Sequence, residues 1–490
     1  MEVLQRTANR GSISTGAASY EIDNSLKFEA DNSEFLTQTI GTGNRRTATY
    51  SFWLKRTELD ASSYMQVAGI SPISSETVRF MFYQDYIMLE NGSGGTRKRL
   101  TTNAVYRDTS AFYHFVVAID TTQSTAANRV KLYVNGVQET SFSTEEYPDQ
   151  NFDLTIGLSG NTWRYGAYDA SNYKFSGYLT ECNYIDGAQL APTEFGEFDA
   201  DSGIWKPIAY AGAYGAQGHY LDFKDSADLG ANAKGSDVNF TLNNITAADQ
   251  ATDTPTNNFA TLEVGSNPAA TFITFNEGNT KLTYAGSTTG YDADGSGISN
   301  FRVNTSGKWY MEFSFAGDGD RAAVGVVSDQ GANRAAGADY TNYIMYRASD
   351  GAVIYDTNGP DVIVTAAGPT YDTPDVIGIA LDCDNERVSF SKNGSWIDGS
   401  GAGASNSSPT YFVDWTGHYF LTNSYGNGNC VFYCSNTVNS GTPVIEANFG
   451  GYTPNTISSA ATDANGYGTF EYAPPSGYYA LCTKNLAEYG

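Results

Sequence analysis

The sequence predicts an all-β protein built from two antiparallel β-sandwiches in tandem, with an ordered Gly/Asn-rich connector and a C-terminal tail. Three observations lead to this fold class. Glycine (51), tyrosine (35) and phenylalanine (26) are abundant among the 490 residues, whereas Lys and Arg together number only 28, a composition typical of turn-rich β-structure. Short segments of alternating apolar and polar residues are separated by Gly, Asn, Asp and Ser almost throughout. A two-strand unit also occurs twice, far apart in the chain.

The repeated unit consists of an apolar strand, an acidic turn, a second strand and an Asn-Gly pair. Its first copy ends at Asn135-Gly136 and its second copy at Asn393-Gly394. Asn-Gly favours a type I′ turn because both central residues of that turn need positive φ. Each pair is therefore expected to close a hairpin and to fix the register of its strands. The matching order of parts predicts two sandwiches of related plan.

Changes in composition set the expected domain boundaries. We divide the chain into an N-terminal arm (1–17), a first sandwich (18–200), a connector (201–263), a second sandwich (264–452) and a C-terminal tail (453–490). Aromatic residues in the connector predict that it docks instead of forming a free linker. Tyr478, Tyr479 and Leu481 likewise predict that the tail packs on the second sandwich.

Charge and composition argue against several functional classes. The formal net charge of −26 disfavours nucleic acid as a partner, because binding it needs clustered Lys and Arg to replace counterions. No stretch approaches the roughly eighteen apolar residues of a membrane span, and the N-terminus does not resemble a signal peptide. We therefore expect a chain that is made in a cytoplasm and does not insert into membranes. Its five scattered cysteines are expected to be buried free thiols.

Two stretches of the sequence resemble known domain families. Residues 50–198 resemble a laminin-G or concanavalin A-like jelly roll, through ATYSFWLKR, FYHFVVAIDTT, VKLYVNGV and FSGYLTECNYIDGAQLAPTEFGEFD. Residues 307–449 resemble a SPRY domain, through GKWYMEFSF, AAVGVVSD, IGIALDCDNERVSFSKNGSW and VIEANFGG. The combination, with GIWKPIAYAGAYGAQGHYLDFKD and TDTPTNNFATLE between the domains, resembles structural proteins of tailed phages, many of them from marine hosts.

This resemblance implies a virion protein, commonly a tail fibre or host-recognition protein, that binds and does not catalyse. The implied partners are other virion proteins, copies of the same chain, with a trimer expected, and a host surface glycan or protein. The resemblance also implies that the protein is synthesised in the host bacterial cytoplasm and is located on the tail or capsid surface of the virion. Calcium is a further expectation, since laminin-G-like domains often bind it at one rim of the sandwich, but no ligand positions in this chain follow from the resemblance.

Two alternatives to host recognition stay open. In the first, the protein is purely architectural, a capsid decoration or tail adaptor, which agrees with the lack of a long coiled-coil shaft. In the second, less favoured, it is a glycan depolymerase. Jelly-roll glucanases hold carboxylates as Glu-x-Asp-x-x-Glu along one strand, and after Glu21 the residue at the second glutamate position is Leu26. We therefore expect that this protein is not an enzyme.

Aromatic and polar side chains in Gly-punctuated loops form the candidate ligand sites. Aromatic rings pack on the apolar side of a pyranose, while Asp, Asn and Arg satisfy its hydroxyl groups. The first group, in one loop of the first sandwich, comprises Trp163, Arg164, Tyr165, Tyr168, Asp169 and Tyr173. The second comprises Tyr340, Tyr343, Tyr346 and Arg347, with Trp396, Trp415, His418 and Tyr425 from neighbouring loops. Trp53 and Trp309, by contrast, fall in strand patterns and are predicted core residues.

Residues 292–295 contain a weak candidate for a metal site. Asp292 and Asp294 alternate before Gly295, as side-chain oxygens do in calcium loops. No further loop acid or distal glutamate completes the pattern. An Asx-rich turn is therefore the preferred interpretation of these residues.

Overall fold

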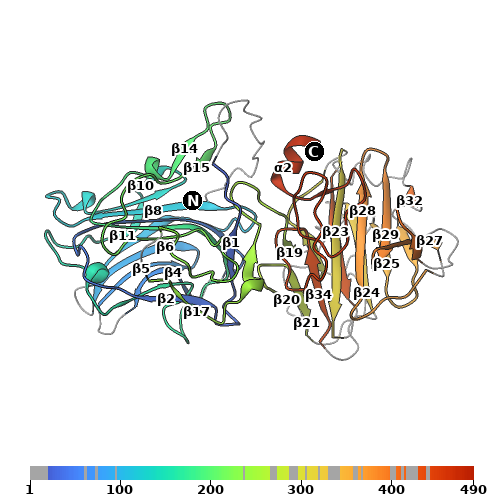
Figure 1. The fold of residues 1–490 in the computed structure, drawn as a ribbon, viewed down its shortest axis with the longest axis horizontal. Coiled ribbons are helices and arrows are strands. Elements are labelled where there is room, and N and C mark those ends of the chain that lie inside the picture. The colour runs from blue at the N-terminus through green and yellow to red at the C-terminus, as the bar shows by residue number, and fades with distance from the viewer. Residues whose placement is uncertain are drawn as a thin grey trace. The chain divides into compact units, whose positions relative to one another are not determined.

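The chain forms two compact units, Met1–Asn258 and Phe259–Gly490, and each is a sandwich of antiparallel sheets (Figure 1). The computed structural model describes residues 20–59, 63–71, 76–93, 97–234, 238–264, 273–285, 296–303, 306–317, 321–328, 343–356, 362–365, 368–397, 404–409, 413–414, 429–436 and 442–490. The predicted fold class, tandem β-sandwiches in an all-β chain, is confirmed. Within the described ranges, no helix has the length and apolar character needed to cross a membrane.

Unit 1 contains two large sheets packed face to face and one small two-stranded sheet. One sheet contains, in spatial order, β10 (Val137–Glu139), β9 (Val130–Val134), β8 (Tyr113–Asp120), β3 (Thr47–Arg56), β13 (Gly177–Asp186), β1 (Ser25–Phe28) and β18 (Gln250–Ala251), with β16 (His219–Leu221) paired to β13. The other contains β11 (Phe142–Glu145), β7 (Lys98–Val105), β6 (Tyr86–Ser93), β5 (Glu76–Tyr83), β4 (Tyr64–Ser71), β12 (Thr162–Tyr165), β2 (Phe35–Thr39) and β17 (Thr241–Asn243). Alternation along the strands turns one face of each sheet inward, so Phe52 of β3 meets Phe80 of β5 with ring centroids 5.1 Å apart.

Unit 2 repeats this two-layer plan. One sheet contains β19 (Leu262–Val264), β22 (Ser296–Ser299), β33 (Cys430–Asn436), β24 (Ala322–Ser328), β25 (Tyr343–Arg347), β26 (Val353–Asp356) and β27 (Val362–Thr365). The other contains β20 (Ile273–Asn276), β21 (Lys281–Tyr284), β34 (Val444–Asn448), β23 (Lys308–Ala316), β28 (Val376–Asp382), β29 (Arg387–Lys392), β30 (Ser395–Ile397) and β31 (Ala404–Asn406), while β32 (Val413–Asp414) pairs with β29. Trp309 of β23 and Phe432 of β33 share its core. The two predicted core tryptophans, Trp53 and Trp309, are both buried.

Helical structure in the described residues is limited to short pieces. The 3-10 turns are η2 (Ala126–Asn128), η3 (Thr155–Gly157), η4 (Pro192–Glu194) and η5 (Ala247–Asp249), and α2 (Thr483–Tyr489) is an α-helix. All five cysteines are free and buried, which confirms the expectation for them.

Both Asn-Gly pairs close hairpins of the predicted type. Asn135-Gly136, between β9 and β10, has φ of 49° and 79°, and Asn393-Gly394, between β29 and β30, has φ of 50° and 77°. Positive φ at both central residues defines a type I′ turn. The asparagine side chains also act alike, because Oδ1 accepts a hydrogen bond of 2.8 Å from the N–H of His114 in unit 1 and of Val376 in unit 2. The repeated unit is thus a common structural element.

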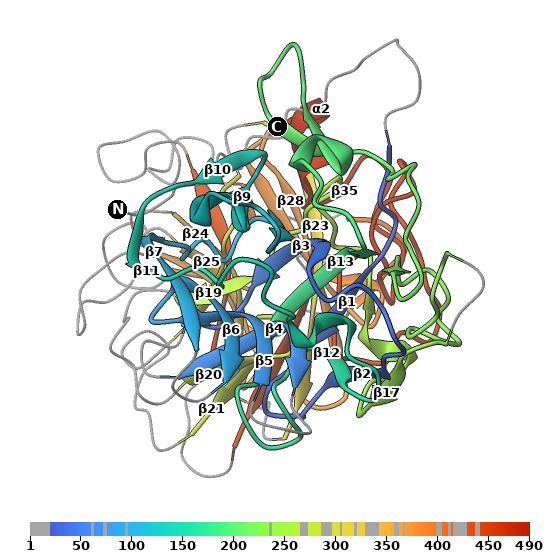
Figure 2. The same ribbon diagram turned by 90° about the vertical axis from the view of Figure 1, so that its left-hand side faces the viewer.

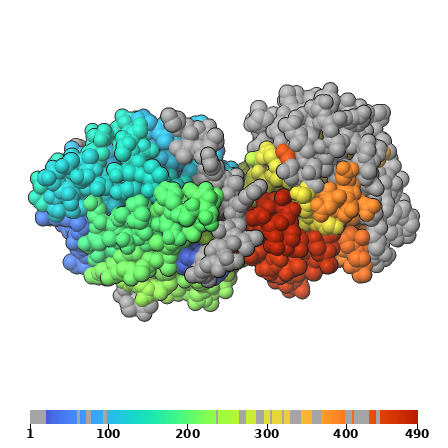
Figure 3. All heavy atoms as spheres, turned by 90° about the horizontal axis from the view of Figure 1, so that it is seen from above, coloured from blue at the N-terminus to red at the C-terminus, as the bar shows by residue number. Residues whose placement is uncertain are grey.

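The segment expected to be a connector, 201–263, lies almost wholly within unit 1. It supplies β15 (Trp205–Pro207), which pairs with β14 (Gly196–Phe198), and it supplies β16, β17 and β18, which extend the two main sheets. Phe223 and Phe240 bury their side chains in the core of unit 1. Figure 3 shows this segment, in green, spread over the surface of that unit. The units divide after Asn258 instead of after residue 263, because these strands are too short to show a period in the sequence.

The C-terminal segment packs on one sheet of unit 2. Its strand β35 (Tyr479–Ala480) pairs in parallel with β23, and its red surface is visible in Figure 3. Glu312 of β23, buried beneath it, accepts hydrogen bonds from the N–H groups of Glu471 and Tyr472 at 2.9 and 2.8 Å. Burial raises the pKa of Glu312 to about 7, although these hydrogen bonds oppose the shift. A buried acid thus fastens the C-terminal segment.

Candidate ligand-binding face of the first sandwich

A row of opposed residues crosses the outer face of the second sheet in unit 1. The strand register places in turn Thr37 (β2), Arg164 (β12), Gly69 (β4), Arg79 (β5), Glu90 (β6) and Arg99 (β7). Figure 2 shows β4, β5, β6 and β7 side by side. Directly opposed side chains on one face of a sheet lie about 5 Å apart at Cβ. The register therefore gathers charged side chains from distant parts of the sequence, and we call this set, together with Arg97, the arginine row.

Glu90 is the centre of the arginine row. Its carboxylate forms ion pairs with Arg79 at 2.5 Å, Arg99 at 2.9 Å and Arg97 at 3.4 Å. The side chains of Glu90 and Arg79 are only 2% and 8% exposed, whereas those of Arg97 and Arg99 are 39% and 34% exposed. Three positive charges therefore surround one negative charge, and two of the three arginines reach the surface.

Several guanidinium donors in the row are not satisfied by the protein. Among the described residues, the buried Nε–H groups of Arg79, Arg99 and Arg164 have no hydrogen-bond acceptor. Leaving a buried donor unpaired costs about 1–3 kcal/mol. Gly69, which stands between Arg164 and Arg79 in the row, places no side chain there. The face therefore has a surplus of hydrogen-bond donors.

Four tyrosines lie beside the arginine row, and we call them the tyrosine cluster. The rings of Tyr64 and Tyr83 stack at 4.3 Å, and Tyr173 meets Tyr64 at 5.2 Å and Tyr168 at 5.6 Å. The guanidinium of Arg79 lies 4.8 Å from the centroid of the Tyr168 ring. Tyr173 is exposed and the other three rings are half-buried. One face thus presents aromatic rings next to cationic donors.

Hydrogen bonds hold the loop that carries Tyr168 and Tyr173 in place. The N–H of Gln66 in β4 donates to the carbonyl of Tyr173 at 2.9 Å. Asp169 accepts from the N–H groups of Ser171 and Asn172 at 2.7 and 2.8 Å. Burial raises the pKa of Asp169, but hydrogen bonds from Asn172 and Ser171 outweigh it, so the pKa is lowered overall. The loop is ordered by an ionised carboxylate and by its bond to β4.

The first predicted ligand group is split by the structure. Arg164, Tyr168, Asp169 and Tyr173 lie at the outer face, but Trp163 and Tyr165 are fully buried in the core of unit 1. Their assignment to a ligand surface is therefore corrected. These residues belong to strand β12, where alternation sends Trp163 and Tyr165 inward and Arg164 outward. Flanking glycines make the segment look like a loop in the sequence.

The second predicted group needs a similar correction. Tyr343, Tyr346 and Trp396 are buried, and the Tyr346 hydroxyl donates to the carbonyl of Pro369 inside unit 2. Arg347 is half-buried and forms an ion pair with Asp350. The remaining candidates, Tyr340, Trp415, His418 and Tyr425, and the metal candidates Asp292 and Asp294 lie outside the described residues. The described members of this group do not form a shared surface.

Apart from Arg164, the arginines of the row were not identified from the sequence, and neither were Tyr64 and Tyr83 of the tyrosine cluster. Arg79 and Glu90 come from neighbouring strands, Arg99 from a third, and Arg97 from the residue before that third strand, so no local motif joins Arg79 and Glu90 to the other two. The basic run RKR at residues 97–99 is the one sequence signal that stands out in an otherwise acidic chain. Its meaning depends on the register, which the sequence does not reveal.

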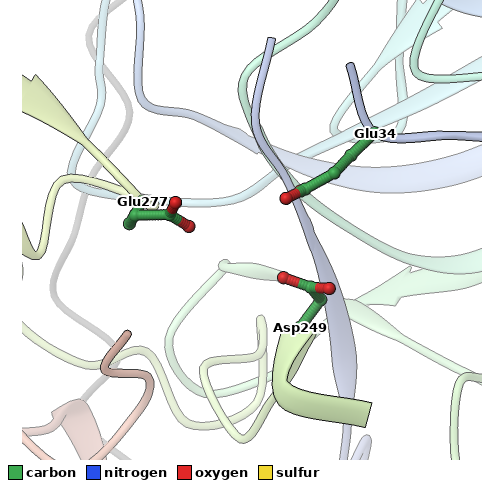
Figure 4. A group of neighbouring side chains, drawn as sticks. All are labelled: Glu34, Asp249 and Glu277. Carbon is green, nitrogen blue, oxygen red and sulfur yellow. The ribbon is translucent and has the colours of Figure 1, made fainter. Parts of the chain in front are cut away.

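A second charged cluster of unit 1 is internal. The ammonium of Lys27 lies 3.0 Å from Glu34 and 2.8 Å from Asp249, and Figure 4 shows these two carboxyl groups directed toward one another. All three residues are buried. Burial raises the pKa of Glu34 to about 7, with Lys27 opposing the shift and Asp249 adding to it. This cluster links β1, the start of β2 and η5, and it has a structural role.

The chain thus consists of one β-sandwich followed by a second sandwich of related plan. Residues 29–189 match the family described as the concanavalin A-like lectin/glucanases superfamily, and residues 308–413 match the SPRY domain. Domains of these two kinds are generally ligand-binding recognition modules. A comparison with curated protein sequences gives no match.

The chain also shows low similarity to solved structures. Domains LG4-5 of the mouse laminin alpha1 chain are 9% identical, with 93% of this chain and 88% of that chain covered and a TM-score of 0.29. A human SPRY domain is 14% identical, with 36% of this chain and 94% of that chain covered and a TM-score of 0.23. The SAP-like pentraxin of Limulus polyphemus is 14% identical, with coverages of 35% and 80% and a TM-score of 0.26.

Proposed function

We propose that this chain is a recognition protein of a tailed-phage particle that binds a host surface glycan without turning it over. The observation that carries the proposal is the tyrosine cluster beside the arginine row on an outer face of a lectin-like sandwich. The resemblance of the whole sequence to tailed-phage structural proteins supports a place on the tail or capsid surface.

The tyrosine cluster suits a sugar ligand physically. Tyrosine rings offer a large apolar surface to the C–H face of a pyranose and lose little conformational entropy on binding. The loop is already ordered by Asp169 and by the bond from Gln66, which reduces the entropy lost on binding. A single shallow site of this kind binds weakly. Assembly of the chain into a homo-oligomer, for which a trimer is our expectation, would raise the effective affinity by linking sites.

Binding of the purified chain to host cells and extracted host glycans tests the proposal. We expect Tyr173→Ala and Tyr64→Ala to weaken saturable binding about tenfold, given about 1–1.5 kcal/mol for a lost aromatic contact. Tyr210→Ala is the matched control, because Tyr210 is also half-buried in unit 1 but stacks on Phe195, which packs on the other sheet. Equal effects of all three substitutions would contradict the proposal. A parallel series with chelator tests the calcium expectation.

A second candidate function, architecture within the particle, is favoured by an apolar patch on unit 1. Val137 and Phe198 are 62% and 53% exposed; Phe198 lies beside Trp205, and Val137 follows Gly136 in the sequence. The Phe198 ring meets Trp205 at 4.8 Å, and the backbone of Gly136 lies directly against the indole. Exposed apolar patches often mark protein contacts. This candidate would be favoured if the Phe198→Ser variant is not incorporated into phage particles and the unaltered chain binds no glycan.

A further inference from the structure

We propose that the arginine row selects an acidic sugar, a glycan residue that carries a carboxylate or a sulfate ester. This inference rests on the proposed function and names the chemical class of its ligand. It follows from three properties of the row: its donor surplus, its accessibility and its contact with the tyrosine cluster.

The donor surplus follows from the chemistry of the groups. Each guanidinium has five N–H donors, and a carboxylate offers about four acceptor positions. Arg79, Arg97 and Arg99 together therefore carry about fifteen donors around the single carboxylate of Glu90. The buried Nε–H groups of Arg79 and Arg99 remain unpaired among the described residues, and the residue Arg79 is only 7% exposed. An anion with several acceptor oxygens matches the outward N–H groups of Arg97 and Arg99, which no single carboxylate can satisfy, whereas a neutral hydroxyl group matches them poorly.

The accessible part of the row is its Arg97 and Arg99 end. These side chains are 39% and 34% exposed, so their outward N–H groups reach a ligand without rearrangement of the core. Glu90 holds both guanidinium groups from below and reduces the entropy they would lose on binding. Arginine binds planar or tetrahedral anions through paired parallel hydrogen bonds, which gives geometric selectivity as well as affinity.

Arg79 connects the row to the tyrosine cluster. Its guanidinium binds Glu90 at 2.5 Å and lies 4.8 Å from the Tyr168 ring centroid. The tyrosine cluster therefore adjoins the row at Arg79, one strand away from Glu90, which binds Arg97 and Arg99. The row is also a local exception in a chain of net charge −26, so general attraction of polyanions does not account for binding there.

Direct binding measurements on the full-length chain test the inference. The probes are a polyuronate, a sulfated dextran and neutral dextran, which separate carboxylate from sulfate recognition. The variants are Arg97→Gln and Arg97→Gln/Arg99→Gln. Arg46→Gln is the matched control, since Arg46 is 44% exposed in unit 1 and pairs with Asp153 away from the face. In the Arg97→Gln variant, Glu90 keeps its ion pairs with Arg79 and Arg99. Thermal unfolding of each variant verifies that it is folded.

We expect an acidic polymer to bind at least about tenfold more tightly than neutral dextran, and the double variant to lose about tenfold, the effect of one charge-assisted hydrogen bond. The Arg97→Gln variant is expected to lose several-fold in affinity for the acidic polymer, and the Arg46→Gln variant is expected to keep its affinity. If the Arg97→Gln/Arg99→Gln variant binds the acidic polymer as tightly as the Arg46→Gln variant does, the inference is overturned. Binding of neutral dextran as tight as that of the acidic polymers, with Tyr173→Ala still weakening it, overturns the inference but leaves the proposed function intact. No binding of any polymer or host glycan by the unaltered chain overturns both.

Discussion

Replacing Glu90 by glutamine tests the central contact of the arginine row. The substitution keeps the size of the side chain but removes the negative charge that faces Arg79, Arg97 and Arg99. Arg79 then keeps a positive charge in a site where its side chain is only 8% exposed. We expect unit 1 to be strongly destabilised, since the substitution leaves a buried positive charge without its partner.

The magnitude follows from the burial of each pair. Breaking a buried ion pair by removing one partner costs about 3–5 kcal/mol, and the Glu90–Arg79 pair is of this kind. The pairs with Arg97 and Arg99 add little, because water screens side chains that are 39% and 34% exposed. The glutamine oxygen still accepts one hydrogen bond, so we expect the low end of that range, about 3 kcal/mol. At about 2–4 °C per kcal/mol for a unit of this size, the melting temperature falls by roughly 6–12 °C.

Scanning calorimetry of the full chain measures this effect, with hydrogen exchange assigning the altered transition to unit 1. Asp153→Asn is the matched control, since it removes the partner of Arg46 in a pair whose side chains are 48% and 44% exposed. That control is expected to melt like the unaltered protein. A Glu90→Gln variant that melts within about 2 °C of the unaltered protein, well below the shift expected for a buried pair, would show that Glu90 does not stabilise Arg79 as proposed.

Three further predictions concern the core, the C-terminal segment and the thiols. Trp163→Ala is expected to destabilise unit 1 by about 3–5 kcal/mol, seen in a denaturant titration, because Trp163 is fully buried; an unchanged stability with lost glycan binding would contradict its core placement. Burial raises the pKa of Glu312 from 4.5 to about 7, so the folded state binds the Glu312 proton more tightly than the unfolded state does. The resulting stabilisation of unit 2 is full below pH 4.5 and is lost as the pH rises to about 7. Glu312→Gln, which does not titrate, should therefore flatten the pH dependence of unit 2 unfolding over that window, and an unaltered slope would refute this. The buried cysteines should react with a thiol reagent only after unfolding, and rapid labelling of the native chain would show that a thiol is accessible.

Much of the fold was predictable because it depends on local sequence. Strand alternation identifies the all-β class, and Asn135-Gly136 and Asn393-Gly394 predict turns whose φ angles the structure shows. The role of residues 201–263 was less predictable. Strands as short as Gln250–Ala251 owe their pairing to distant neighbours such as Ser25–Phe28, and two or three residues have no measurable period.

The candidate site was predictable only in part, for a related reason. Tyr168 and Tyr173 stand out as aromatic residues in a Gly-punctuated loop, and both lie on the outer face. Trp163 has the same appearance in the sequence, but its strand position turns it into the core. Arg79 and Arg99 meet only through cross-strand register with Glu90, and register depends on the whole sheet.

Hydrogen exchange of the full chain, with and without a host glycan, is the measurement that tests the central claim most directly. We expect slower exchange in the loop 166–175 and in β4, β5, β6 and β7 when the glycan is bound, with β8 and β9 of the other sheet unchanged. Protection confined to other regions, such as β14 and β15 beside Phe198, or no protection at saturating glycan, would contradict the claim that this face recognises the ligand.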